Sequence, residues 1–171
     1  MKNLKKIMFL VLAISMVNLS SCKKDNDGGD GKDGSSGIIK AKVNGSAFSS
    51  MEMTSFATKA TGGGQTTLII QGNTSTQAIS IHITGYDGVG TYEIKDSNVF
   101  TIATYMEPDI SNPTNSPTWN APYQSSGTVG QIKIAEETST HIIGSFNFKA
   151  KNMKDNSIKD ITGGSFNLKI Q

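Results

Sequence analysis

The heptapeptide GSFNFKA at residues 144–150 recurs twenty residues later as GSFNLKI at residues 164–170. Within each copy, apolar and polar side chains alternate, which is the two-residue period of a strand with one buried face. A single pair of copies is too few for a solenoid, which needs at least three stacked repeats. The repeat therefore predicts two neighbouring strands of a hairpin that bury the same face.

The same alternation extends over residues 38–171. Residues 78–84, for example, read AISIHIT. No window of helical length keeps an apolar stripe at the i, i+3, i+4 spacing, and the abundant Thr, Ser, Asn and Gly favour strands and turns. We expect strands at about 38–43, 47–57, 66–71, 78–84, 90–95, 98–106, 127–135, 139–151 and 158–170.

Short connections join these predicted strands. Asn44-Gly45 is typical of a two-residue type I′ hairpin, and the glycine-rich segments 61–64 and 87–90 are further turn signals. Tight turns connect antiparallel neighbours, whereas parallel strands need long crossovers. The sequence therefore predicts an all-β domain, an antiparallel β-sandwich of about nine strands. A closed, lipocalin-like β-barrel is the alternative.

The N-terminus has the features of a bacterial secretion signal. A basic start, MKNLKK, precedes about thirteen mostly apolar residues, too few to span a bilayer as a helix. Leu19-Ser20-Ser21-Cys22 resembles a lipobox, which implies cleavage before Cys22 and acylation of its thiol. Because Cys22 is the only cysteine, it forms no internal disulfide. We expect residues 1–21 to be a cleaved signal peptide and Cys22 to carry membrane lipid.

Residues 22–37 follow as the lipidated cysteine and an Asp/Gly-rich tether. Residues 23–37 contain no apolar side chain, which predicts disorder. GGDGKD at 28–33 matches the start of a calcium-binding nonapeptide, but Ser35 replaces its apolar position and one copy makes no site. We therefore predict no metal. The charged segment after Cys22 resembles surface-export signals of Bacteroidota lipoproteins, which implies the outer membrane and display on the cell surface. An ordinary polar spacer, with the domain on the periplasmic side, is the alternative that the sequence leaves open.

Composition and motifs exclude several functions. All basic residues are lysine, and the formal charge without residues 1–21 is −1, from 13 Lys minus 14 acids. Because arginine is the preferred side chain for phosphate groups and base edges and the chain has none, we predict no nucleic-acid partner. The chain has no nucleophile elbow, zinc motif or P-loop, and His82 and His141 lie at exposed strand positions without a pairing spacing. We predict no enzyme, no catalytic residue and no cofactor.

One segment is a candidate for ligand binding. The stretch EPDISNPTNSPTWNAPYQSS at 107–126 contains all four prolines and the only tryptophan. Long loops of this kind are often functional. In one interpretation Trp119, Tyr123 and Asn120 form a platform for carbohydrate. In the other, Trp119 folds back to plug one end of the β core, and the sequence leaves both open.

Both ends of the domain carry a family resemblance. IIKAKVNGSAFSS opens it at 38–50, and GTVGQIKIAEE, HIIGSFNFKA and ITGGSFNLKI close it between 127 and 170. With the lipobox and the tether, these stretches resemble the small uncharacterised lipoproteins of Bacteroidota, classed as domains of unknown function. The resemblance implies no site residues.

We expect a membrane-anchored envelope lipoprotein of unknown specific activity with a non-catalytic binding or accessory β domain. Its partners would be membrane lipid through Cys22 and either carbohydrate or another envelope protein. Two alternatives stay open. One is a structural protein that docks an envelope partner through a sheet edge or loop, and the other is a lipocalin-like barrel around a small apolar ligand.

Overall fold

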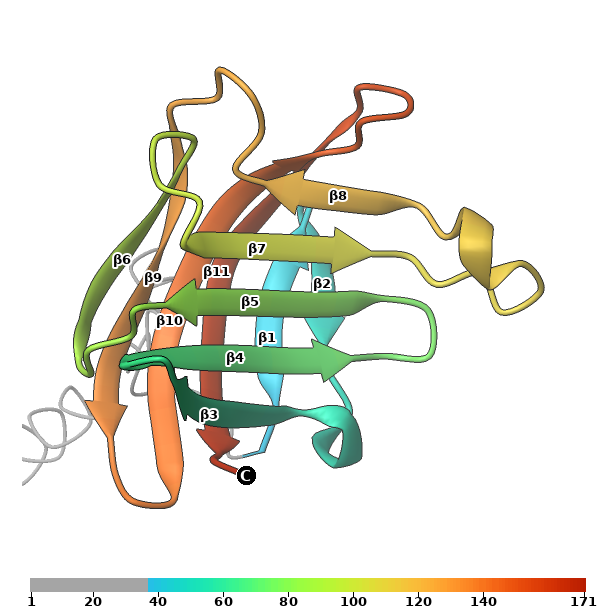
Figure 1. Cartoon of the computed structure of the whole chain (residues 1–171). Helices are drawn as coiled ribbons and strands as arrows, with labels where there is room; N and C mark the ends of the chain where they lie inside the picture. The colour runs from blue at the N-terminus through green and yellow to red at the C-terminus, as the bar shows by residue number, and fades with distance from the viewer. Residues whose placement is uncertain (1–36) are drawn as a thin grey trace, which may run out of the picture.

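The computed structural model describes residues 37–171, where the chain forms eleven strands and two short 3-10 helices (Figure 1). The predicted signal peptide, Cys22 and nearly all of the tether lie outside these residues. Within them, no helix is long and apolar enough to cross a membrane. The elements are β1 (Ile39–Val43), β2 (Ser46–Ser49), η2 (Glu52–Thr54), β3 (Phe56–Gly62), β4 (Gln65–Asn73), β5 (Ala78–Thr84), β6 (Gly90–Lys95), β7 (Thr101–Met106), η3 (Pro113–Asn115), β8 (Thr118–Ala121), β9 (Thr128–Glu137), β10 (His141–Lys151) and β11 (Ile158–Lys169).

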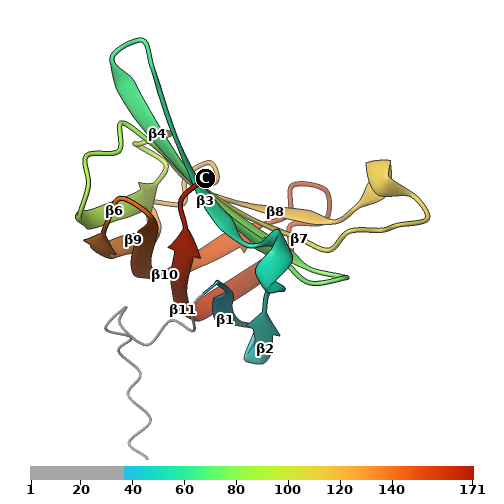
Figure 2. The same cartoon turned by 90° about the horizontal axis from the view of Figure 1, so that it is seen from below.

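All named strands pair antiparallel, in the order β2-β1-β11-β10-β8-β7-β5-β4-β3. The sheet turns a corner at β10, because residues 142–148 of β10 pair with β9 while Lys151 pairs with Asn120 of β8. Strand β6 adds to the far edge of β9. The sheet thus forms a front layer (β3, β4, β5, β7, β8) and a back layer (β2, β1, β11, β10, β9, β6), whose strands cross in Figure 1 and face each other in Figure 2.

The two layers meet again on the side away from the corner. Ala57 of β3 bridges to Ile170, and the Gln171 N–H donates to the Ala57 carbonyl oxygen at 2.9 Å. The predicted all-β antiparallel fold is confirmed. The fold combines features of both predicted architectures. Its two layers pack face to face as in a sandwich, and they belong to one continuous sheet that curls as in a barrel.

The core lies between the layers and is contributed differently by each. The front layer supplies mainly aliphatic side chains, whereas the back layer supplies a cluster of phenyl rings. Fully burying one such side chain stabilises the fold by about 2 kcal/mol. The fully buried members include Leu68, Ile70, Ile79, Ile81 and Ile83 from the front layer and Ile132, Ile142, Phe148, Phe166 and Leu168 from the back layer.

The repeated heptapeptide pairs with itself, so the predicted hairpin with one buried face is confirmed. Gly144 lies opposite Phe166, and Phe146 lies opposite Gly164. A Cβ built on Gly144 would lie 2.5 Å from the Phe166 ring, and one on Gly164 would lie 2.6 Å from the Phe146 ring. The two rings stack at 6.3 Å between centroids. Each phenyl ring therefore fills the space that the opposite glycine leaves.

The single strand predicted at 47–57 is wrong, because the chain turns between β2 and β3. Buried serines stabilise the turn. The Ser50 hydroxyl accepts a hydrogen bond from the Ile39 N–H at 2.7 Å, and the Ser55 hydroxyl lies 2.6 Å from it. The loop predicted at 107–126 likewise contains a strand, β8, which is four residues long between prolines.

Candidate functional site

The outer face of the front layer is the candidate site. One cross-strand row runs through Thr58, Ile69, His82 and Ile102. The row beside it runs through Phe56, Gln71, Ser80, Thr104 and Asn120. We call the outward-facing residues of this layer the neutral face. They are Phe56, Thr58, Ala60, Thr67, Ile69, Gln71, Asn73, Ala78, Ser80, His82, Thr84, Ile102, Thr104, Met106, Thr118 and Asn120.

The neutral face contains no Asp, Glu, Lys or Arg. Its one group that titrates near neutral pH is His82, at the middle of the layer on β5. Burial among its neighbours lowers the pKa of the imidazole below its ordinary value, because the charged form loses hydration. His82 Nε2 lies 3.0 Å from the Ser80 hydroxyl. The face is therefore uncharged at pH 7.

Apolar side chains remain exposed at one end of this face. Ile102 is 39% exposed although it lies in a strand. The preceding segment adds Val99 and Phe100, at 69% and 57%. The Phe100 carbonyl accepts a hydrogen bond from the Thr84 N–H at 2.8 Å, which holds this segment beside the end of β5. The neutral face thus continues into an exposed apolar patch.

The three residues predicted to bind carbohydrate do not share one face. Trp119 is only 5% exposed and packs on Tyr105, with 5.6 Å between ring centroids. Asn120, the next residue of β8, points outward, since successive strand residues face opposite sides. Tyr123 is partly buried, and Lys151 Nζ lies 5.9 Å from its ring centroid. An exposed stacking platform on Trp119 is therefore not formed, and only Asn120 belongs to the neutral face.

A first Tyr–Glu–Lys cluster ties β3 and the end of β5 to β9. The Tyr86 hydroxyl donates to Glu137 Oε2 at 2.6 Å, and Lys59 forms an ion pair with the other carboxylate oxygen. Lys59 Nζ lies 5.5 Å from the Tyr86 ring centroid, within range of a cation–π interaction. Burial, and then the hydrogen bond to Glu137, raise the pKa of the Tyr86 phenol, while the hydrogen bond from Lys59 lowers the pKa of Glu137.

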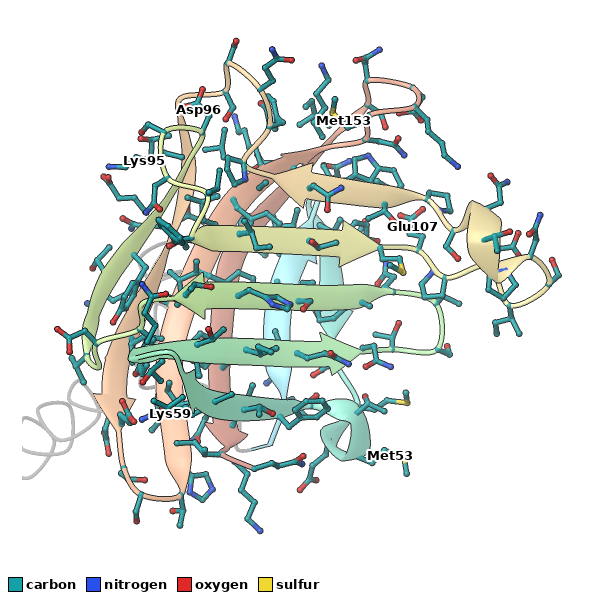
Figure 3. All side chains as sticks on the ribbon, viewed as in Figure 1. Met53, Lys59, Lys95, Asp96, Glu107 and Met153 are labelled. Carbon is teal, nitrogen blue, oxygen red and sulfur yellow. The ribbon has the colours of Figure 1, made fainter. Side chains whose placement is uncertain are left out.

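A second cluster with the same three residue types ties β7 to β11. Glu107 Oε1 accepts from the Tyr105 hydroxyl at 2.9 Å and from Lys159 Nζ at 2.7 Å. Lys159 Nζ also lies 4.6 Å from the Trp119 ring centroid. Lys59 and Glu107 mark the two clusters on opposite sides of the molecule in Figure 3. Each carboxylate already has both partners, so we assign the clusters to holding the layers together.

The chain's two histidines, His82 and His141, lie on different layers. His82 is in the front layer, whereas His141 begins β10 and its Nδ1 lies 2.9 Å from the Thr140 hydroxyl. Between residues 37 and 171, no three His, Cys, Asp or Glu side chains gather in a way that could hold a metal ion. The candidate site is therefore defined by the uncharged outer surface of the front layer and not by a cluster of metal ligands.

The sequence interpretation missed the neutral face, although a signal for it was present. Strands β4, β5, β7 and β8 read QTTLIIQGN, AISIHIT, TIATYM and TWNA, without a single charged residue. A strand with one solvated face ordinarily places charged or strongly polar residues there. Four neighbouring strands without charge therefore predict an uncharged outer face for this layer.

The comparisons with known proteins place the chain in one family. No curated protein and no solved structure matches it. A family model described as a domain of unknown function, DUF6252, matches residues 35–168. The match covers β1 to β10 and almost all of β11. Because it spans most of the chain, this protein belongs to the DUF6252 family of domains of unknown function.

Proposed function

We propose that this protein is an outer-membrane lipoprotein of the Bacteroidota type, acylated at Cys22 and displayed on the cell surface. Its β domain is a non-catalytic module that docks another envelope protein through the neutral face. The lipobox and the charged segment behind Cys22 support the anchor and the location. The neutral face supports the docking role.

The absence of charge across the front layer is the observation that carries the docking role. The buried centre of a protein interface is depleted in charged residues and is surrounded by a polar rim. The neutral face has this arrangement, with Phe56, Ile69 and Ile102 among uncharged polar groups. Lys151 and Glu107 lie at its borders, next to Asn120 and Met106. A partner with an uncharged, partly apolar surface fits this face best.

The size of the face indicates a modest interface. Five strands spaced about 4.8 Å apart span roughly 20 Å, and their shared length is of similar size. The flat area is thus roughly 400 Å², and a contact over it would bury roughly 800 Å² on both partners together, at the low end for protein interfaces. The exposed Val99 and Phe100 enlarge it. Such an area suits a reversible contact rather than an obligate one.

Photo-crosslinking in cells tests the docking role. A photoreactive amino acid at Ile102 is expected to give a discrete protein adduct, as is one at His82. The matched control is Thr162, which faces outward on β11 in the back layer and is exposed. Equal adducts at all three positions, or no adduct at the two front positions, would contradict the proposal.

The anchor has its own test. The Cys22→Ser chain is expected to lose palmitate labelling and to remain an unprocessed precursor, whereas the wild-type chain is labelled and processed. Labelling that persists in Cys22→Ser would contradict acylation at this residue.

A neutral glycan is the second candidate ligand for the same face. It is favoured by two hydrogen-bonding pairs beside apolar side chains. Thr104 Oγ1 donates to Asn120 Oδ1 at 3.1 Å, and Ser80 pairs with His82. A glycan array that compares wild type with Asn120→Ala, using Asn147→Ala on the back layer as control, distinguishes this candidate. Binding that only Asn120→Ala loses would assign the face to glycan and not to protein.

The lipocalin-like alternative has less support. Tyr105, Phe148 and Phe166 are fully buried between the layers, in the space where a barrel would hold its ligand.

A further inference from the structure

The outer face of the back layer differs from the neutral face in its charge. Its strands β1, β9, β10 and β11 present six lysines outward. Lys151 lies at the border with the neutral face, and we call the other five the lysine face. Glu136 and Asp160 oppose them on these strands, and β6 beside β9 adds the ion pair of Glu93 with Lys95. The domain as a whole is balanced in charge, so the lysines are concentrated here. The lysine face consists of Lys40, Lys42, Lys133, Lys149 and Lys169.

The lysines are spread across the face rather than stacked at one edge. One cross-strand row runs from Lys40 through Ser165 and Ser145 to Lys133. Adjacent strands lie about 4.8 Å apart, so the row spans roughly 15 Å. The small serines between its ends leave a broad, positively charged surface. Such a surface complements a plane of anionic groups better than it complements a single small anion.

The chain enters the domain beside the lysine face. The Gly37 N–H donates to the Asn167 carbonyl oxygen on β11 at 2.8 Å, which places the start of the described chain two residues from Lys169. Residues 23–37 separate this point from Cys22 and reach at most roughly 50 Å. A tether of this length keeps the domain near the bilayer at a high effective concentration.

We propose that the lysine face lies against the anionic headgroups of the membrane that holds Cys22. The inference rests on the proposed lipid anchor. Each lysine near an anionic leaflet strengthens association by about fivefold, and salt weakens it. Because the two layers are packed face to face, their outer surfaces point in opposite directions (Figure 2). The neutral face is then turned away from the bilayer, toward its partner.

Lysine acetylation of the full processed protein in native membranes tests the orientation. Lys42, Lys149 and Lys169 are all exposed in the structure, as is Lys154 in the β10–β11 turn, which serves as the internal control. In membranes, acetylation of the first three is expected to be severalfold slower, relative to Lys154, than in detergent. Adding about 0.5 M NaCl is expected to remove the difference. Equal rates in protein that sediments with the membranes would overturn the orientation alone, whereas absence from the membranes would overturn the anchor.

Reconstitution identifies what covers the face. The lipidated protein is placed in phosphatidylcholine vesicles with or without about 30% phosphatidylglycerol. Protection is expected only in the anionic vesicles, and protection in both would overturn the electrostatic contact. If the lysines are protected in native membranes but in neither kind of vesicle, another envelope component covers the lysine face, and the proposal is overturned.

A charge-neutralised variant provides the matched comparison. A cysteine introduced at Thr162, an exposed position on β11 of the same face, is expected to be protected from a water-soluble maleimide in anionic vesicles. Lys42→Gln/Lys149→Gln/Lys169→Gln is expected to remove this protection, whereas Lys154→Gln is expected to retain it. All substituted positions are exposed, so the melting temperatures serve as a check that both variants fold. Retained protection in the folded triple variant would contradict the proposal.

Discussion

The front and back layers share one core but differ completely on their outer faces. Both are antiparallel, and both bury every second side chain against the other. Outside, the front layer presents no charged side chain, while the back layer presents lysines together with Glu136 and Asp160. The inner faces must exclude water for the domain to fold, whereas the outer faces are free to differ. The difference between the outer faces is therefore not required by the fold, and it is the basis of the two proposed contacts.

The corner between the layers is the most sensitive point of this arrangement. We expect Trp119→Ala to lower the free energy of unfolding by about 4 kcal/mol, because it removes a buried aromatic side chain. It also removes the Nε1–H bond to Ser157 at 2.8 Å and the contact with Lys159. Thermal unfolding followed by far-UV circular dichroism measures the loss. Phe100→Ala, at an exposed ring, is the control, and an equal small effect of both would contradict burial of Trp119.

The paired glycines of the back layer come next. We expect Gly144→Ala to cost about 3 kcal/mol, because the new methyl group would overlap the Phe166 ring and the Lys133 carbonyl oxygen. Gly62→Ala in β3 is the matched control, since nothing lies within 4 Å of its added Cβ and its φ is not positive. Urea unfolding followed by Trp119 fluorescence compares the two. A Gly144→Ala chain as stable as Gly62→Ala would show that the strands are not paired in this register.

These two regions show what sequence reasoning can reach. Alternation in 144–150 and 164–170 was enough to predict that the strands are neighbours and bury one face. It could not predict that Gly144 meets Phe166, because a shift of two residues preserves every inward and outward position. Likewise β8 is too short for alternation to be recognised between prolines. Its pairing with β7 is what places Trp119 inside and Asn120 outside.

The neutral face could be predicted only in part. The lack of charge in each front strand is visible in the sequence, but the face exists because β3, β4, β5, β7 and β8 lie side by side. The order of strands depends on long-range pairing, such as β7 with β8 across the 107–117 segment. The two Tyr–Glu–Lys clusters are likewise assembled from residues far apart in the chain, Glu137 with Lys59 and Glu107 with Lys159. Local patterns carry no information on such contacts.

Acid is expected to reveal His82 as the titrating group of the neutral face. Burial lowers its pKa in the folded state below the ordinary 6.5. At a pH between the folded and the unfolded pKa, the unfolded chain therefore binds more protons than the folded chain. Stability therefore rises with pH across this window and falls as the pH drops below about 6.5. Unfolding measured from pH 7 to 5 is expected to show a shallower slope in His82→Gln than in wild type. An unchanged slope would contradict the pKa direction.

The smallest effect on stability is expected at Ile102, and it separates the two layers most clearly. Ile102→Lys places a charge on an exposed position, as Thr162→Lys does on β11, so both are expected to change stability by less than about 0.5 kcal/mol. Only Ile102→Lys puts a charge in the neutral face, where a bound partner would have to desolvate it. Introduced together with a photoreactive group at His82, Ile102→Lys is expected to abolish the protein adduct, and Thr162→Lys is expected to leave it intact. Loss of the adduct in both variants would contradict docking through the neutral face. A charge added to the back layer, which faces the membrane, would then disturb the partner as strongly as a charge added to the front layer.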